Sequence, residues 1–207
     1  MDLVAILGRT LGFSFAAGIN LYATVALVGL SSRFGLVDLP ERLRIFDNDV
    51  VIGVALVLYV VEFAADKIPW VDSAWDTVHT FIRPLGGALI AVAALGEASP
   101  TLEGLIALLG GSIAASTHLT KASARVAVNA SPEPVSNWIV SLAEDLFVVG
   151  LGYLALVHPG VALIVVSVLL VMIVAFMGVI ARLAWRRLFR RSPRTSASVQ
   201  AGPSGLH

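Results

Sequence analysis

The chain has 207 residues, of which 57% are hydrophobic and only 14% are charged, with 14 basic and 14 acidic side chains in balance. With a mean hydropathy of +0.89, this composition excludes an ordinary soluble domain, and we expect no nucleic-acid partner. The absence of cysteine excludes disulfides and thiolate metal sites.

Successive apolar segments predict an all-α, polytopic transmembrane helical bundle of about six spans, because helices satisfy the backbone within lipid. We expect the spans at about 3–30, 50–65, 75–96, 102–121, 135–157 and 160–185. The last is apolar without interruption over the roughly 20 residues that cross a bilayer. The third and fourth are polar for about half of their length, so short or re-entrant helices are the alternative for these two segments.

The first segment and the loop after it carry local signals. Gly18 and Asn20 permit an unwinding of the first span beside a cavity. The alternative is an Asn20 side chain that only forms a hydrogen bond between helices. In the loop, residues 39–46 predict a short helix that begins at Pro40 and lies in the plane of the membrane interface.

A run of charge between residues 62 and 83 lies where the chain should meet lipid. Ionisable groups in a membrane are costly, so they are retained mainly where they line a cavity, pair or bind a substrate. On the third helix, Asp76, His79 and Arg83 share one face at i, i+3, i+7 spacing. On the second helix, Glu62 and Asp66 stack at i, i+4 spacing.

Two later helices add charge at a similar depth. His118, Lys121 and Arg125 line one face of the fourth helix. Glu144 and Asp145 lie roughly 15 Å from the start of the fifth helix, at about 1.5 Å per residue. Such charges must face inward, since a central charge costs about 2.5–3.5 kcal/mol.

Arg83 is the expected cationic hub of this cluster, because arginine stays charged under almost any burial. Its partner should be Glu62, Glu144 or Asp145. A static ion-pair network that only specifies the fold is the alternative reading. A divalent metal held by His79, Asp76, Glu62 and Asp66 is a second, weaker alternative, so we expect neither a metal nor a cofactor.

The pattern Pro-x-x-x-Ser-x-Trp begins at Pro69 and again at Pro132. It suggests an internal repeat of two helix pairs, 50–96 and 102–157, as many transporters have. Coincidence explains three matching positions equally well.

Arginines follow the last apolar run, six of them between residues 182 and 194. Under the positive-inside rule we expect a transmembrane domain over 1–186 and a cytoplasmic tail over 187–207, first basic and then disordered. The tail either binds anionic lipid or only anchors the last span. Six spans then place both termini in the cytoplasm of a bacterium, with the protein in its inner membrane.

Six short motifs resemble a bacterial integral membrane family, the domain of unknown function 4126 (DUF4126). They lie at residues 18–24, 62–69, 79–84, 117–121, 131–138 and 141–145. The resemblance covers about residues 10–158. It implies a membrane protein whose polar positions belong to a family pattern, and it brings no activity.

These observations favour a transporter or permeation protein for a small ion or anionic solute, and not an enzyme. The predicted transport or binding site comprises Asn20, Glu62, Asp66, Asp76, His79, Arg83, His118, Lys121, Arg125, Glu144 and Asp145. One alternative is a membrane-embedded enzyme acting on a lipid or polyprenyl phosphate headgroup, with Asp76 and His79 as acid and base. Another is a noncatalytic scaffold. The oligomeric state and the solute stay open.

Overall fold

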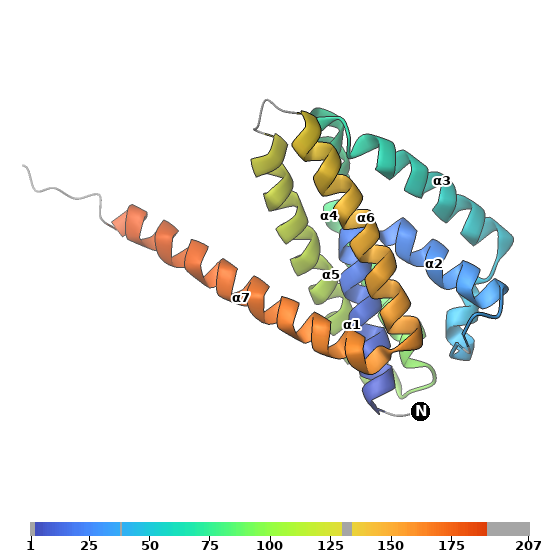
Figure 1. The fold of residues 1–207 in the computed structure, drawn as a ribbon. Helices are drawn as coiled ribbons and strands as arrows, with labels where there is room; N and C mark the ends of the chain where they lie inside the picture. The colour runs from blue at the N-terminus through green and yellow to red at the C-terminus, as the bar shows by residue number, and fades with distance from the viewer. Residues whose placement is uncertain (1–2, 38, 130–133, 190–207) are drawn as a thin grey trace, which may run out of the picture. The chain divides into compact units, whose positions relative to one another are not determined.

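The computed structural model describes residues 3–37, 39–129 and 134–189, which form helices and no strand (Figure 1). The helices are α1 Leu3–Ile19, α2 Leu21–Arg33, the 3-10 helix η1 Glu41–Phe46, α3 Asp49–Ala65, α4 Pro69–Leu95, α5 Pro100–Asn129, α6 Pro134–Val157 and α7 Pro159–Phe189. The chain divides into two compact units, Met1–Ile173 and Val174–His207. The first unit holds every predicted site residue, and the described part of the second is helical.

Four helices are long and apolar enough to cross a membrane, namely α4, α5, α6 and α7. The all-helical prediction is therefore confirmed, whereas the count of six spans is not. The expected first span is divided into α1 and α2, and α3 is only 17 residues long. The third and fourth predicted spans are long continuous helices of 27 and 30 residues.

The break in the first segment occurs at Asn20, one of the two residues at which the sequence permits an unwinding. Asn20 has extended backbone angles, φ −145° and ψ 99°, between the last residue of α1 and the first of α2. Its side-chain oxygen accepts a hydrogen bond from the Ala23 amide at 2.9 Å and so caps the start of α2. The chain changes direction at this point (Figure 1).

The short helix predicted in the loop is the 3-10 helix η1. Leu39 is buried and Leu43 is fully buried in the core, so η1 packs against the bundle, and its place in the membrane interface stays a prediction. The expected repeat stays a prediction, since its second copy begins at Pro132, outside the described residues. The predicted tail also falls outside them from residue 190 onward.

The helices α4 and α5 pack closely, and α1 lies against α4, α5 and α6. Glycine makes the α4–α5 contact possible. A Cβ atom on Gly110 would lie 2.4 Å from the Ala91 Cβ and 2.9 Å from the Gly87 carbonyl oxygen. Small residues at such contacts let helix backbones approach within lipid. This approach brings the charged faces of α4 and α5 together.

We predict that Gly110→Ala lowers the free energy of unfolding by about 1–3 kcal/mol, because the added methyl group overpacks the α4–α5 contact. Gly104→Ala is the matched control on the same helix, where an added Cβ meets no atom within 4 Å. The free energy of unfolding of the control should equal that of the parent or slightly exceed it, since alanine is a better helix former than glycine. Denaturant unfolding in detergent measures both variants, and equal stabilities would contradict this packing.

Candidate functional site

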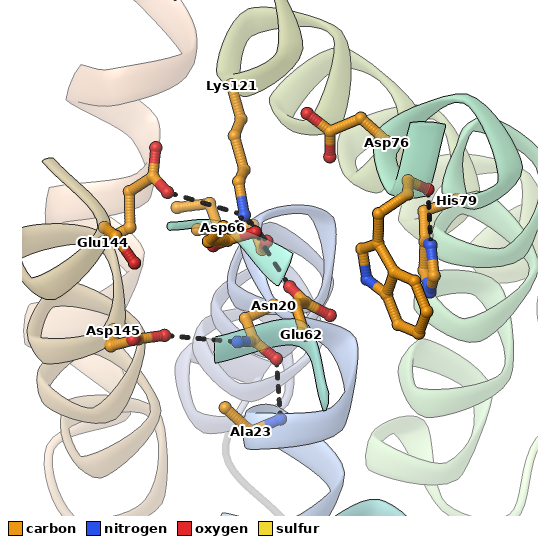
Figure 2. A network of polar contacts seen from close by, with 12 residues as sticks. Asn20, Ala23, Glu62, Asp66, Asp76, His79, Lys121, Glu144 and Asp145 are labelled. Carbon is orange, nitrogen blue, oxygen red and sulfur yellow. Dashed lines mark hydrogen bonds and ion pairs between the residues drawn. The ribbon is translucent and has the colours of Figure 1, made fainter. Parts of the chain in front are cut away.

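The charged residues meet at one end of the bundle, where α3 passes into α4 (Figures 1 and 2). The end of α5 reaches the start of α4 there, since the Asn129 side chain donates to Asp72 Oδ2 at 2.8 Å and to the Pro69 carbonyl at 3.3 Å. The ion pairs at this end join Glu62, Asp66, Asp72, Asp76, Arg83, Lys121, Arg125 and Glu144. Four helices thus contribute to one network.

Arg83 is fully buried and forms the predicted hub between α3, α4 and α5. Its guanidinium lies 2.9 Å from Glu62 Oε1 and 3.3 Å from Asp76 Oδ1. Its Nη1 atom is also 2.7 Å from His118 Nδ1. Of the three partners expected for Arg83, Glu62 is confirmed.

The two alternatives, Glu144 and Asp145, do not pair with Arg83, because each has a nearer partner. Glu144 Oε2 lies 3.0 Å from Arg125 Nη2 and 3.5 Å from Lys121 Nζ. Asp145 instead accepts a hydrogen bond from the Asn20 side chain at 3.2 Å. An exchange of charges between Arg83 and Glu144 would therefore restore no contact.

Lys121 and Arg125 connect α5 to the end of α3 as well. Asp66 Oδ2 lies 3.3 Å from Lys121 Nζ and 3.0 Å from Arg125 Nη2. Lys121 Nζ also lies 3.7 Å from Glu62 Oε1. Each of these two cations is therefore shared between carboxylates of different helices, as Figure 2 shows for Lys121. This sharing fixes α3 and α6 against α5.

The broken end of α1 lies in the same site. Arg83 donates to the Gly18 carbonyl at 3.4 Å, and Lys121 donates to the Ile19 carbonyl at 3.2 Å. The last carbonyls of a helix have no partner within the helix and carry partial negative charge, so cations stabilise them. On the other side of the break, Asn20 is 1% exposed and binds Asp145. The site and the helix break thus stabilise each other.

The two predicted histidines have different surroundings. His118 Nδ1 must accept from Arg83, because a guanidinium only donates. Its Nε2 therefore carries the hydrogen and donates to the Asp76 carbonyl at 3.1 Å, which makes His118 a neutral part of the network.

His79 is buried beside the network and not in it. Its Nδ1 donates to the Trp75 carbonyl at 2.8 Å, and its Nε2 lies 2.9 Å from the Tyr22 hydroxyl. Its ring stacks on the Trp75 ring, with centroids 4.6 Å apart. Within the described residues, no ion pair joins His79 to a carboxylate. His79 therefore positions α2 against α4.

Two polar residues outside the predicted set, Asn137 and Asp72, also belong to the site. Asn137 donates to the Asp66 carbonyl at 3.0 Å and accepts from Arg125. Asp72 is fully buried, with Oδ1 4.0 Å from Arg125 Nε. Helical spacing could have indicated both residues, because residues four or seven apart share one face of a helix. Asn137 precedes Glu144 by seven residues, and Asp72 precedes Asp76 by four.

The site holds more acid than base. Six carboxylates gather there, counting Asp145, against the three cations Arg83, Lys121 and Arg125. Asp145 is 7% exposed, and no ion pair reaches it among the described residues. Buried oxygen atoms of Glu62, Asp66 and Asp145 also lack a hydrogen-bond partner there. Unsatisfied buried acceptors are costly, so this surplus calls for protons, cations or water.

Lys67 lies between α3 and α4 and does not cancel the surplus through a direct ion pair in the described residues. Its ammonium lies 3.1 Å from the Phe63 ring centroid and donates to Ser141 Oγ at 3.2 Å. Burial lowers the pKa of Lys67 below its ordinary value, and the nearby Asp145 and Asp66 offset this effect only in part.

The metal alternative gains no support from this geometry. In residues 3–37, 39–129 and 134–189, no three histidine, aspartate or glutamate side chains converge as a metal site requires. Both ring nitrogens of His79 are engaged by Trp75 and Tyr22.

We predict that Arg83 and Glu62 are energetically coupled. Arg83→Gln or Glu62→Gln alone should cost about 3–5 kcal/mol of unfolding free energy, since each leaves a buried charge without its partner. The double variant should cost less than the sum of the two, by about 0.5–3 kcal/mol.

The control cycle pairs Arg83→Gln with Asp145→Asn, two sites that share no contact in the network. Its effects should add within about 0.5 kcal/mol. Unfolding in detergent measures both cycles, and additivity in the Arg83–Glu62 cycle would refute the hub.

Comparisons with known proteins bear on the family alone. A family model described as "Domain of unknown function (DUF4126)" matches residues 7–178. No curated protein and no solved structure matches the chain. The match covers most of the chain, including every residue of the charged site, and agrees with the resemblance seen in its motifs. The chain belongs to the DUF4126 family.

Proposed function

We propose that this protein is an integral membrane protein that moves protons across the bilayer through the charged site at the Asn20 break. The observation that carries the proposal is the surplus of buried carboxylates over the three cations of the site. Buried charge within membrane segments most often marks an ion or proton pathway. The four long apolar helices support the membrane location.

The geometry favours a positively charged cargo over an anionic solute. Arg83 is held by two carboxylates, and Lys121 and Arg125 are each held by three within 4.0 Å. An anion would have to displace these carboxylates and approach a site with surplus negative charge. The same argument weakens the lipid-phosphate enzyme, which needs these cations free for its substrate.

Protons suit the surplus better than a metal ion. The open oxygen atoms belong to separate carboxylates, Glu62 Oε2, Asp66 Oδ1 and Asp145 Oδ2, and no acidic triad converges among the described residues. A proton needs only one such oxygen atom, whereas a metal ion needs several together.

The broken first segment supports a transport role. Secondary transporters place their sites where discontinuous helices end near the middle of the membrane, with helix ends and unwound backbone facing the ion. Here the end of α1 and the cap of α2 both contact the charged site, through Lys121 and Asp145 respectively. Location in a bacterial inner membrane, with both termini in the cytoplasm, is part of the proposal.

We predict that Asp145→Asn abolishes proton movement and leaves the fold intact. Asparagine can keep the hydrogen bond to Asn20, and no ion pair of Asp145 within the described residues is lost. The assay reconstitutes the full chain in vesicles with a trapped pH-sensitive dye and imposes a pH gradient with a permeant counterion.

Glu97→Gln is the control, because Glu97 is an exposed carboxylate just beyond the end of α4. The parent and the control should dissipate the gradient faster than empty vesicles, and Asp145→Asn should not. A parent protein that conducts no faster than empty vesicles would remove the proposal and favour the scaffold.

A further inference from the structure

A small polar cavity opens between α4 and α5 beside the charged site. It has a volume of about 210 Å³, and its lining includes Ser73, Thr77 and Thr80 with the charged Asp76 and Arg125. The three hydroxyl residues are exposed, so the cavity reaches the outer surface of the helix pair. Asp76 is 6% exposed and Arg125 is 1% exposed, so they form its buried floor.

Both buried residues present an unsatisfied polar atom. Asp76 Oδ1 and Arg125 Nε have no hydrogen-bond partner among the described residues. Asp76 Oδ1 lies 3.3 Å from Arg83 Nη1, and Arg125 Nε lies 4.0 Å from Asp72 Oδ1. Buried polar atoms in folded proteins bind protein groups or ordered water, and both residues line the adjoining cavity.

The hydroxyl groups make the cavity wall suitable for water. Each donates its hydrogen to a backbone carbonyl one turn earlier, from Ser73 at 3.0 Å, Thr77 at 2.8 Å and Thr80 at 3.0 Å. The oxygen atoms of Ser73 and Thr77 therefore remain able to accept hydrogen bonds from water, whereas the Thr80 oxygen also lies 3.1 Å from His118 Nε2. A water molecule occupies about 30 Å³ in the liquid, so the cavity has room for several.

The cavity also lies at a suitable depth. Ser73 is about 6 Å and Thr80 about 16 Å along α4 from Pro69, at about 1.5 Å per residue. It therefore extends inward from the start of α4, and Asp76, the carboxylate that lines it, lies within two turns of Pro69.

We propose that this cavity is the water-filled path by which protons reach the charged site, with Asp76 as the first carboxylate on that path. This inference rests on the proposed function. A proton passes from a hydronium in the cavity to the Asp76 carboxylate and leaves a water molecule behind. The neutral carboxyl group then releases its ion pair with Arg83, which also holds Glu62. His118 and Arg125 are the other cationic or basic groups that face Asp76.

Because the chain has no cysteine, a single cysteine can test the path directly. Thr77→Cys places a thiol in the cavity wall, and Val78→Cys is the matched control on the adjacent, 58% exposed position that faces away from it. Folded full-length protein in sealed vesicles is treated from each side with a cationic, membrane-impermeant methanethiosulfonate. We expect Thr77→Cys to react at least about tenfold faster, from one side only, because the reactive thiolate forms in water.

A second pair of variants tests the effect of filling the cavity. Ala122→Phe places a ring in its lining, and Ala124→Phe places the same ring on an exposed part of α5 outside it. Ala122→Phe should slow both the labelling of Thr77→Cys and proton movement by about tenfold or more, since it displaces the water. Ala124→Phe should change neither.

The outcomes separate the two proposals. Selective labelling of Thr77→Cys that Ala122→Phe blocks would support the water path even if the parent protein moved no protons, and only the transport proposal would then fail. Equal labelling of Thr77→Cys and Val78→Cys, or proton movement unaffected by Ala122→Phe, would overturn the path and leave transport standing.

Discussion

The end of α1 inside the bundle depends on cations supplied by two other helices. Arg83 from α4 and Lys121 from α5 donate to the carbonyls of Gly18 and Ile19, which have no partner within their own helix. Without water to replace these bonds, a broken helix within lipid is unfavourable. The carboxylates of α3 and α6 hold the same cations, so the break, the ion pairs and the packing of four helices are interdependent.

Spacing along single helices could be predicted from the sequence. The inward face of Asp76 and Arg83, and that of Lys121 and Arg125, follow from helix periodicity and the cost of charge in lipid. The partner of Arg83 across helices could be narrowed only to Glu62, Glu144 or Asp145, because the choice depends on how closely the helices approach, as α4 and α5 do at Gly110. Backbone carbonyls as partners leave no trace in the sequence either.

The site combines a fixed part with a part that can exchange protons. Arg83 and Arg125 keep their charge at any ordinary pH, and they hold most carboxylates in ion pairs. Asp145 stands apart, bound by the neutral Asn20 beside the break. A protonation change at such a residue alters the charge of the site without dismantling it. Under the proposed function, this division lets a stable bundle carry a mobile proton.

Infrared spectroscopy of the purified protein tests the surplus of acid most directly, because the carbonyl stretch of a protonated carboxyl group is distinct from the bands of a carboxylate. We expect such a band in the parent protein at neutral pH, weakened in Asp145→Asn and shifted when the solvent is exchanged for deuterium oxide. A spectrum with every carboxyl group ionised at neutral pH would contradict it, and the site would then be a network neutralised by bound cations.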